Sequence, residues 1–234
     1  MLPVAILAGG RATRLGSLTQ TLPKALLPVA GRPFIHWQLA LLAQQGVTQV
    51  VLCAGHLGEQ IQAAVGDGTG FGVSVRYSFD GDALLGTGGA LKHALPLLGT
   101  ASFILYGDSY LPCSFAAVQA AYEASAAPGL MAVFCNEGRW EKSNVLFRDG
   151  RVVAYDKHSP GPHMRHVDYG LSILSTRALQ ETPDNTAFDL GELYCELATR
   201  GELAALTVAE RFYEIGSVAG IEATENYLAS RGRA

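Results

Sequence analysis

Short apolar runs alternate with segments of helical spacing along the first 135 residues, and this alternation constrains the fold more than any other feature of the chain. Val4–Leu7 is an apolar run followed at once by Gly9-Gly10, and Phe103–Tyr106 is another that ends at Gly107-Asp108. Apolar runs of this length that end at glycine favour buried strands. Further strands are predicted over Gln49–Ala54, Val73–Tyr77 and Leu130–Phe134.

The segments between these runs have the apolar spacing of helices. Four apolar side chains recur at helical intervals between Pro33 and Gly46, so a helix is predicted over residues 33–45. Further helices are predicted over residues 57–65, 90–98 and 115–125. Strands that alternate with helices form βαβ units, which assemble a mostly parallel sheet with helices on both faces.

The pattern changes after Asn144. Two apolar runs, 145–147 and 152–155, flank Asp149-Gly150, a dipeptide that favours a hairpin turn. Strands are then predicted over 167–174, 203–208 and 211–215, and helices over 190–199 and 218–229. Because the sequence contains neither a Pro/Ser-rich linker nor an internal repeat, we expect one α/β domain over residues 1–234 with a mixed, mostly parallel central sheet.

The composition excludes several classes of protein. With 49% hydrophobic and 16% charged residues, the chain is too apolar to be disordered. No apolar stretch is long enough to span a bilayer, and the N-terminus lacks a basic leader segment. The net charge of −4 argues against a nucleic-acid partner. The four scattered cysteines form no Cys-x-x-Cys pair, so reduced thiols in a cytoplasmic protein are expected.

The net charge hides an asymmetry. The first 58 residues carry four basic and no acidic side chains, while the remainder carries 13 basic and 21 acidic ones. A polyanion would be attracted to the N-terminal segment. A chance run in a Gly-rich, apolar stretch would give the same count, so charge alone leaves both interpretations open.

The loop after the first predicted strand has the features of a phosphate-binding loop. Gly9 and Gly10 allow a ligand to approach the backbone, whose N–H groups can cradle an anion. Arg14 and Lys24 supply cationic side chains for phosphate oxygens. The loop matches neither the Walker motif nor the dinucleotide-binding fingerprint, which argues against a dehydrogenase.

The same loop begins a longer motif. The pattern Leu7-Ala8-Gly9-Gly10-x-x-Thr13-Arg14-Leu15 is followed by Leu22-Pro23-Lys24 and by Gly31-Arg32-Pro33-Phe34. In this order the elements resemble the signature of sugar-1-phosphate nucleotidylyltransferases. The resemblance runs through nearly the whole chain and implies a Rossmann-like nucleotidyltransferase fold, with a nucleotide-binding part over 1–135 and a sugar-phosphate-binding part over 136–234. Ala12 is a departure, since relatives commonly have Gly there.

The resemblance assigns two groups of binding residues. The segment Leu85-Gly86-Thr87-Gly88-Gly89 matches one that contacts the nucleotide base, and its form is most similar to heptose-1-phosphate guanylyltransferases. The nucleotide is therefore expected to contact Leu7, Ala8, Gly9, Gly10, Thr13, Arg14, Gly86, Thr87, Gly88 and Asp108. By the same resemblance, the sugar phosphate is expected to contact Asn144, Lys157, Asp168 and Gly170; Asp168 stands where relatives usually carry Asn. From the residues alone, Lys157 would be an ordinary exposed lysine and Gly86–Gly89 a helix-capping turn.

Two carboxylates are candidates for a magnesium site. Asp108 follows a buried strand, where its carboxylate faces the ligand crevice, although a helix N-cap is an alternative. Glu214 and Ser217 stand where relatives usually have Asp and Thr in Asp-x-Gly-Thr. Mg²⁺ takes one or two carboxylates together with substrate phosphates, so Asp108 and Glu214 are expected to hold it.

These expectations combine into a reaction with Arg14, Lys24, Asp108 and Lys157 as catalytic residues. A sugar 1-phosphate attacks the α-phosphate of a nucleoside triphosphate and pyrophosphate leaves. GTP with a heptose 1-phosphate is the first expectation. The alternatives are UTP with N-acetylmuramate or hexose 1-phosphate, CTP with phosphocholine or a phosphonate, and a non-catalytic nucleotide-sugar sensor. The protein is expected to be a monomer or homodimer.

Overall fold

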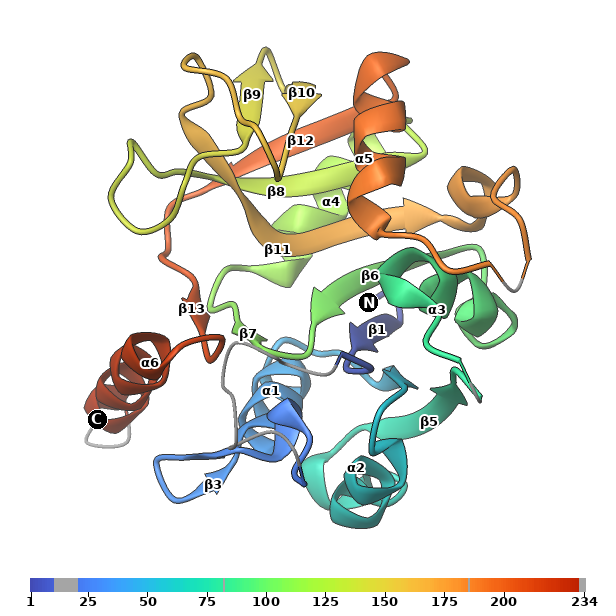
Figure 1. Cartoon of the computed structure of the whole chain (residues 1–234), viewed down its shortest axis with the longest axis vertical. Coiled ribbons are helices and arrows are strands. Elements are labelled where there is room, and N and C mark those ends of the chain that lie inside the picture. The colour runs from blue at the N-terminus through green and yellow to red at the C-terminus, as the bar shows by residue number, and fades with distance from the viewer. Residues whose placement is uncertain (11–20, 82, 185, 232–234) are drawn as a thin grey trace.

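A computed structural model describes residues 1–10, 21–81, 83–184 and 186–231 of the chain. Its centre is a nine-stranded sheet with the order β5-β4-β1-β6-β11-β8-β12-β10-β9 (Figure 1). The strands are β1 (Val4–Leu7), β4 (Gln49–Ala54), β5 (Ser74–Phe79), β6 (Ala101–Tyr106), β8 (Gly129–Cys135), β9 (Val145–Arg148), β10 (Arg151–Tyr155), β11 (His166–Ser175) and β12 (Leu203–Val208).

The two halves of the sheet differ in strand direction. Strands β5, β4, β1 and β6 are all parallel, so their carboxyl ends meet at one edge. Strand β11 is antiparallel to both β6 and β8 and joins the two halves. Beyond it, β8 and β12 are parallel, while β10 and β9 form the predicted hairpin. Asp149 and Gly150 have φ of 49° and 73°, the left-handed values that a tight hairpin turn requires. A mixed sheet is therefore confirmed, but it is not mostly parallel: among the described residues, four neighbouring strand pairs are parallel and four are antiparallel, because β11 and β10 run against their neighbours.

Helices cover both faces of the sheet. One core cluster packs α1 (Phe34–Gln44), α2 (Gly58–Val65) and α4 (Phe115–Ser125) against one face. A second packs α3 (Gly86–Ala94) and α5 (Leu190–Thr199) against the other. A third, smaller cluster holds α6 (Val218–Arg231), which lies apart from the sheet beside the short ladder of β7 (Ser109–Tyr110) and β13 (Tyr213–Glu214) (Figure 1).

Some element boundaries differ from the predictions. The helix expected over 90–98 begins at Gly86 and ends at Ala94, where a 3₁₀ turn, Leu95–Leu97, takes over at Pro96. The strand expected over 211–215 is only Tyr213–Glu214. A small hairpin, β2 (Pro28–Val29) with β3 (Arg32–Pro33), was not predicted. Its turn residues Ala30 and Gly31 both have positive φ, as a tight turn needs.

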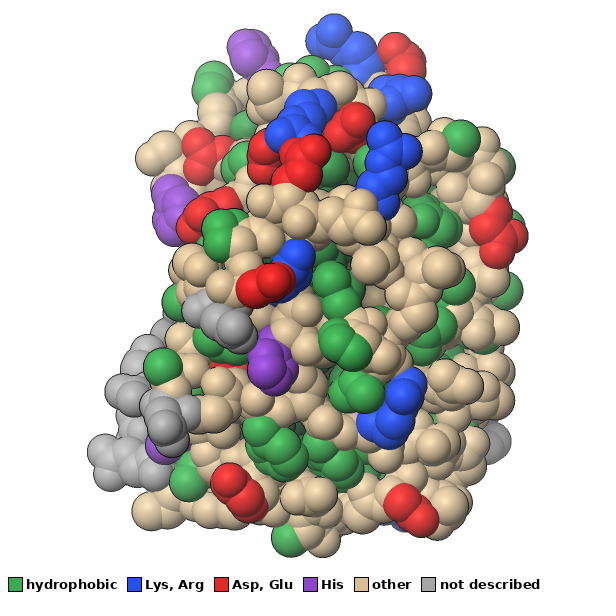
Figure 2. All heavy atoms as spheres, turned by 90° about the vertical axis from the view of Figure 1, so that its right-hand side faces the viewer, with side chains coloured by type: hydrophobic (Ala, Val, Ile, Leu, Met, Phe, Trp, Pro, Cys, Tyr) green, Lys and Arg blue, Asp and Glu red, His purple; other side chains and the backbone are tan. Residues whose placement is uncertain are grey.

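The surface gives two further observations. None of the helices among the described residues is long and apolar enough to cross a bilayer. On the face seen in Figure 2, acidic and basic side chains lie next to each other toward the upper end. Arg200, the C-cap residue of α5, forms ion pairs with Glu181 and Glu196. The described side chains of this face form no continuous basic patch of the kind nucleic-acid-binding proteins use.

Candidate active site

A cavity of about 270 Å³ opens at the carboxyl ends of the parallel strands. Ligands of open α/β sheets bind at this edge. Seven residues that the sequence assigned to the nucleotide line the cavity, together with Lys24: Leu7, Ala8, Gly9, Gly10, Gly86, Thr87 and Asp108. Thr13 and Arg14 lie outside the described residues.

Lys24 and Asp108 form an ion pair in the wall of this cavity. Lys24 Nζ lies 2.6 Å from Asp108 Oδ2, and Ser109 Oγ donates to Asp108 Oδ1 at 3.2 Å. Lys24 begins a 3₁₀ turn whose other residues, Ala25 and Leu26, are buried, and this anchors the lysine at the cavity. The structure thus brings together two residues that the sequence placed in separate roles.

The turn that carries Asp108 is held in place from two sides. A side chain on Gly107 would come within 3.0 Å of Leu7 O and of Ala8, so only glycine lets β6 end this close to the β1 loop. On the other side, Gln38 Nε2 on α1 donates to the carbonyl oxygens of Tyr106 and Ser109 at 2.9 and 2.8 Å. Gln38 is buried, and its role was not predicted because a buried helical Gln gives no local signal.

Glu214 lies beside Asp108 through the ladder between β7 and β13. Glu214 pairs with Ser109, and Ile215 N–H donates to Asp108 O at 3.0 Å. The Glu214 carboxylate accepts hydrogen bonds from Gly216 N–H and Ser217 Oγ. A Cβ on Gly216 would lie 3.1 Å from Lys24 Nζ and would overlap the Glu214 carboxylate, so this glycine lies close to both side chains.

Two carboxylates fit a magnesium ion that takes its other ligands from phosphates and water. Among the described residues there is no group of three or more His, Cys, Asp or Glu side chains that could hold a metal ion. Asp108 lines the cavity, whereas Glu214 lines a separate hollow beside α6, so a magnesium site shared by these two carboxylates stays a prediction.

Gly88 lies away from the cavity lining and packs against Phe188 instead. Its N–H donates to Phe188 O at 3.0 Å, and a Cβ on Gly88 would overlap the Phe188 ring. Gly86 and Gly89 also face this segment, at Phe188 O and Thr186 O. The glycine-rich start of α3 therefore packs against residues 186–188. A nucleotide contact of Gly88 stays a prediction.

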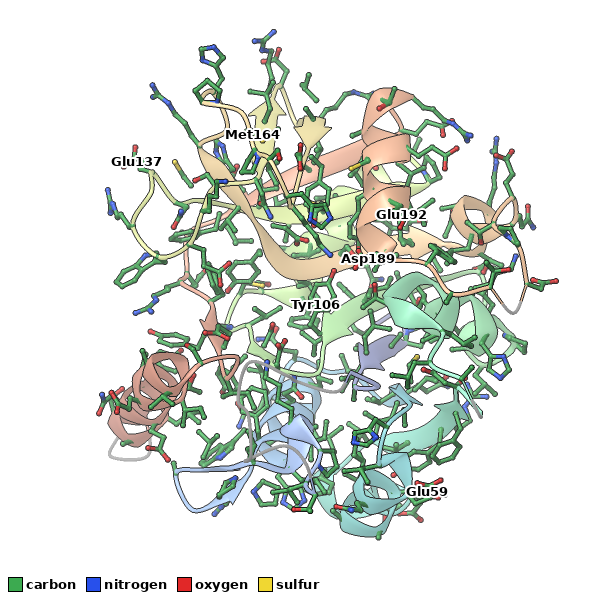
Figure 3. The ribbon with its side chains drawn as sticks, in the orientation of Figure 1. Glu59, Tyr106, Glu137, Met164, Asp189 and Glu192 are labelled. Carbon is green, nitrogen blue, oxygen red and sulfur yellow. The ribbon has the colours of Figure 1, made fainter. Side chains whose placement is uncertain are left out.

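Lys157 forms a second ion pair, near the Tyr106 side of the cavity. Its Nζ is 2.9 Å from Asp189 Oδ1 and 5.9 Å from the centre of the Tyr106 ring, which lines the cavity. Figure 3 shows Tyr106 and Asp189 close together where the upper and lower halves of the molecule meet. Lys157 thus comes near the cavity from the C-terminal half, two residues after the end of β10.

The remaining sugar-side residues form one hydrogen-bonded group on β11. Asp168 N–H donates to Asn144 Oδ1, and Gly170 N–H donates to Asp168 Oδ1, both at 2.9 Å. Tyr155 OH donates to Asp168 Oδ2 at 3.2 Å. Burial raises the pKa of the Asp168 carboxyl, although the Gly170 N–H and Lys157 act against the shift. The structure brings these residues together with Lys157, and their binding to a sugar phosphate stays a prediction.

Three residues at the cleft were missed by the sequence analysis. Asp80 lines the cavity just after β5 and accepts a hydrogen bond from Leu85 N–H at 3.2 Å; burial raises its pKa. Tyr106 lines the cavity too, with a buried hydroxyl that has no hydrogen-bond partner among the described residues. Asp189 holds Lys157. Of the three, Asp80 and Tyr106 could have been found, because each lies at the carboxyl end of a predicted parallel strand.

The chain belongs to the family described as the MobA-like NTP transferase domain, which it matches over residues 4–206. It is 31% identical over 160 residues to a D-glycero-α-D-manno-heptose 1-phosphate guanylyltransferase from Aneurinibacillus thermoaerophilus, covering 67% of this chain and 69% of that protein. It is 45% identical over 106 residues to an N-acetylmuramate α-1-phosphate uridylyltransferase from Neisseria meningitidis, covering 45% of this chain. That match spans only about half of the relative, 46% of its length.

The fold is similar to that of solved structures. HddC from Yersinia pseudotuberculosis, solved in complex with GMP-PN, superposes with a TM-score of 0.81 at 23% identity. The superposition covers 97% of this chain and 100% of HddC. The Rossmann-like nucleotidyltransferase fold predicted from the motifs is therefore confirmed.

Proposed function

We propose that this protein is a sugar-1-phosphate nucleotidylyltransferase. The observation that carries the proposal is a pair of lysines near one cavity: Lys24 lines it beside Asp108, and Lys157, beside Asp189, lies 5.9 Å from the ring of Tyr106, which lines the same cavity. Two cations near one cavity suit two phosphorylated substrates that meet there. In the proposed reaction, a phosphate oxygen of the sugar 1-phosphate bonds to the α-phosphorus of the triphosphate, and the bond to the bridging oxygen of pyrophosphate breaks.

The residues of this chain would act by alignment and charge neutralisation. The attacking oxygen is already anionic, so the reaction needs no general base. Lys157 would hold the sugar phosphate, and Lys24 would donate to the leaving pyrophosphate. Arg14 is proposed to bind the triphosphate. Mg²⁺ held by Asp108 and Glu214 would neutralise charge on the α-phosphate. In this proposal, residues 1–135 form the nucleotide-binding part and residues 136–234 the sugar-phosphate-binding part.

GTP with a heptose 1-phosphate is the proposed substrate pair. Asp80 supports guanine, because a carboxylate in the nucleotide cavity can accept from both N–H donors on the guanine Watson–Crick edge, whereas uracil offers one. UTP with N-acetylmuramate or a hexose 1-phosphate is the second candidate. The 45% identity to the Neisseria uridylyltransferase over 106 residues favours it.

A pyrophosphate-release screen tests the proposal. Purified protein with Mg²⁺ is assayed with GTP, UTP, CTP, ATP and dTTP, each against heptose, N-acetylmuramate and hexose 1-phosphates, phosphocholine and a phosphonate. Release with GTP and heptose 1-phosphate supports the first candidate. Release with CTP and phosphocholine or the phosphonate supports a cytidylyltransferase. Nucleotide binding without release in every pairing would overturn the enzyme and favour a sensor. Running the assay material through a sizing column also tests the predicted monomer or homodimer.

A further inference from the structure

Residues 186–190 run along the start of α3 and lead into α5, and we call them the crossing segment. Phe188 exchanges two backbone hydrogen bonds with the start of α3: Gly88 N–H donates to Phe188 O at 3.0 Å, and Phe188 N–H donates to Leu85 O at 3.1 Å. Leu190 N–H then donates to Thr87 Oγ1 at 2.8 Å. The crossing segment is therefore fixed against the wall of the nucleotide cavity.

Asp189 lies in the crossing segment and uses one carboxylate oxygen for two contacts. As the N-cap of α5 it accepts from Gly191 N–H at 2.6 Å, and the same oxygen accepts from Lys157 Nζ at 2.9 Å. A Cβ on Gly191 would lie 3.2 Å from Lys157 Nζ, so the lysine side chain packs against the first turn of α5. Its ammonium is thus held by a carboxylate whose own position is set by the backbone.

We propose that Asp189 is a positioning residue for Lys157. This inference rests on the proposed function, in which Lys157 binds the sugar phosphate. A lysine has a flexible four-carbon stem and three N–H donors. Asp189 takes one donor and holds the stem in place, so the other donors remain for a phosphate and less rotamer freedom is lost on binding. Through the Thr87–Leu190 hydrogen bond, this position is set relative to the nucleotide.

Two variants separate the positioning role from helix capping. Ser caps a helix about as well as Asp but is too short to reach Lys157, so Asp189→Ser removes only the ion pair. Asp189→Asn keeps the cap and an oxygen acceptor but loses the charge. Asp184→Ser is the matched control, because Asp184 is an exposed carboxylate that pairs with a different lysine, Lys92, at 3.3 Å in the same connection.

Steady-state kinetics on the best substrate pair is the first measurement. Asp189→Ser should lower kcat/KM for the sugar 1-phosphate about tenfold, or about 1.4 kcal/mol, while the KM for the triphosphate changes less than about twofold. Asp189→Asn should lie between Asp189→Ser and wild type, and Asp184→Ser should match wild type. In a Lys157→Met background, Asp189→Ser should have no further effect, since the two residues act as one unit.

Any of three results would overturn the inference. In the first, Asp189→Ser lowers kcat/KM for the sugar 1-phosphate as much in the Lys157→Met background as in wild type. It could weaken both substrates equally together with a lower thermal midpoint, which indicates a structural role. It could strengthen sugar-phosphate binding, which would make Asp189 a latch that competes with substrate.

Calorimetry keeps this test separate from the test of the enzyme activity. α-D-Glucose 1-phosphate is titrated into wild type, Asp189→Ser and Lys157→Met in the presence of Mg²⁺. If wild type releases no pyrophosphate in any pairing but binds this probe more tightly than both variants do, the proposed function fails and the positioning of Lys157 stands. If wild type and Asp189→Ser bind the probe equally, or neither binds it, the positioning role is wrong.

Discussion

The two lysine–aspartate pairs have similar lengths, 2.6 and 2.9 Å, but different surroundings. In the cavity wall, the side chains of Lys24 and Asp108 are 18% and 35% exposed. The side chains of Lys157 and Asp189 are 31% and 51% exposed. By exposure alone, the Lys24–Asp108 pair would contribute more to stability than the Lys157–Asp189 pair, since exposed pairs contribute little. The hydrogen-bond partners of the two aspartates show a further difference between the pairs.

The hydrogen bonds to the Asp108 carboxylate come from side chains, whereas Asp189 accepts one from a backbone N–H as well as one from Lys157. The Asp108 carboxylate accepts from two side chains, Lys24 Nζ and Ser109 Oγ. The Asp189 carboxylate accepts from the backbone N–H of Gly191. In the proposed reaction, Lys24 and Asp108 would exchange each other for phosphate and metal, while Asp189 would stay in place and leave Lys157 to meet the substrate. Both members of the first pair would then act on substrate or metal, whereas the second pair would act through its lysine alone.

The largest expected effect comes from removing the charge of Asp108. Asp108→Asn should lower kcat on the order of 10³-fold, because the proposed metal loses a charged ligand while side-chain volume is kept. The measurement is pyrophosphate release at saturating substrates, with circular dichroism to show that the fold is intact. The effect should exceed that of Asp189→Ser about a hundredfold, since only Asp108 would contact the reacting groups. If Asp108→Asn turned over at nearly the wild-type rate, Asp108 would not be a metal ligand, and the proposed difference between the two ion pairs would be wrong.

A smaller effect is expected where the crossing segment meets α3. Gly88→Ala should lower the free energy of unfolding by about 1–3 kcal/mol, because the new methyl group overlaps the Phe188 ring. Urea unfolding measures the change. In a Phe188→Leu background the same substitution should cost less, since the ring is gone. Gly10→Ala is the contrast: a Cβ there meets nothing within 4 Å, so unfolding should be unchanged even if nucleotide binding suffers. Gly88→Ala that weakens nucleotide binding without loss of stability would show that Gly88 contacts the ligand.

The sequence predicted those features that local pattern determines. The bounds of β4, α4, α5 and β12 agree with the predictions, because each is a compact apolar or amphipathic run. The start of α3 was placed four residues late, since Gly86, Gly88 and Gly89 disfavour a helix on their own. Contacts with a segment about 100 residues further along the chain overcome that preference, and no local pattern carries them.

The candidate site shows the same limit. The motifs singled out Lys24, Asp108, Lys157 and Asp168 as candidate site residues. The pairing of these residues was not predicted, because Lys24 and Asp108 are 84 residues apart and Lys157 and Asp189 are 32 apart. Asp189 looks in sequence like an ordinary helix cap, which it also is. Its proposed role of positioning Lys157 depends on where that lysine lies after the hairpin of β9 and β10, which the local sequence around Asp189 does not show.

The smallest expected effect is on the pH dependence of stability, where Asp168 and Asp189 should act with opposite sign. Lys157 favours the ionisation of both carboxylates. Burial raises the pKa of Asp168. Burial also opposes ionisation of Asp189, but the Lys157 and Gly191 donors outweigh it and lower the pKa of Asp189. The folded state therefore holds a proton on Asp168 that the unfolded chain has lost, so this group makes stability fall as pH rises from about 4 toward its folded pKa. Asp189 has the opposite sign: its contribution is present above about pH 4 and is lost as pH falls through its folded pKa.

Urea unfolding of wild type, Asp168→Asn and Asp189→Asn at several pH values between 3 and 7 measures both signs. Asn at position 168 can still accept from Gly170 N–H, and its amide can donate to Tyr155 OH, so the hydrogen bonds survive while the titration is removed. The stability of Asp168→Asn relative to wild type should rise with pH, and that of Asp189→Asn should fall. Parallel curves for wild type and Asp168→Asn would mean that Asp168 is solvated well enough to ionise freely. Asp168 and Asp189, both beside Lys157, would then differ through the Asp189 ion pair alone and not through the burial of their carboxylates.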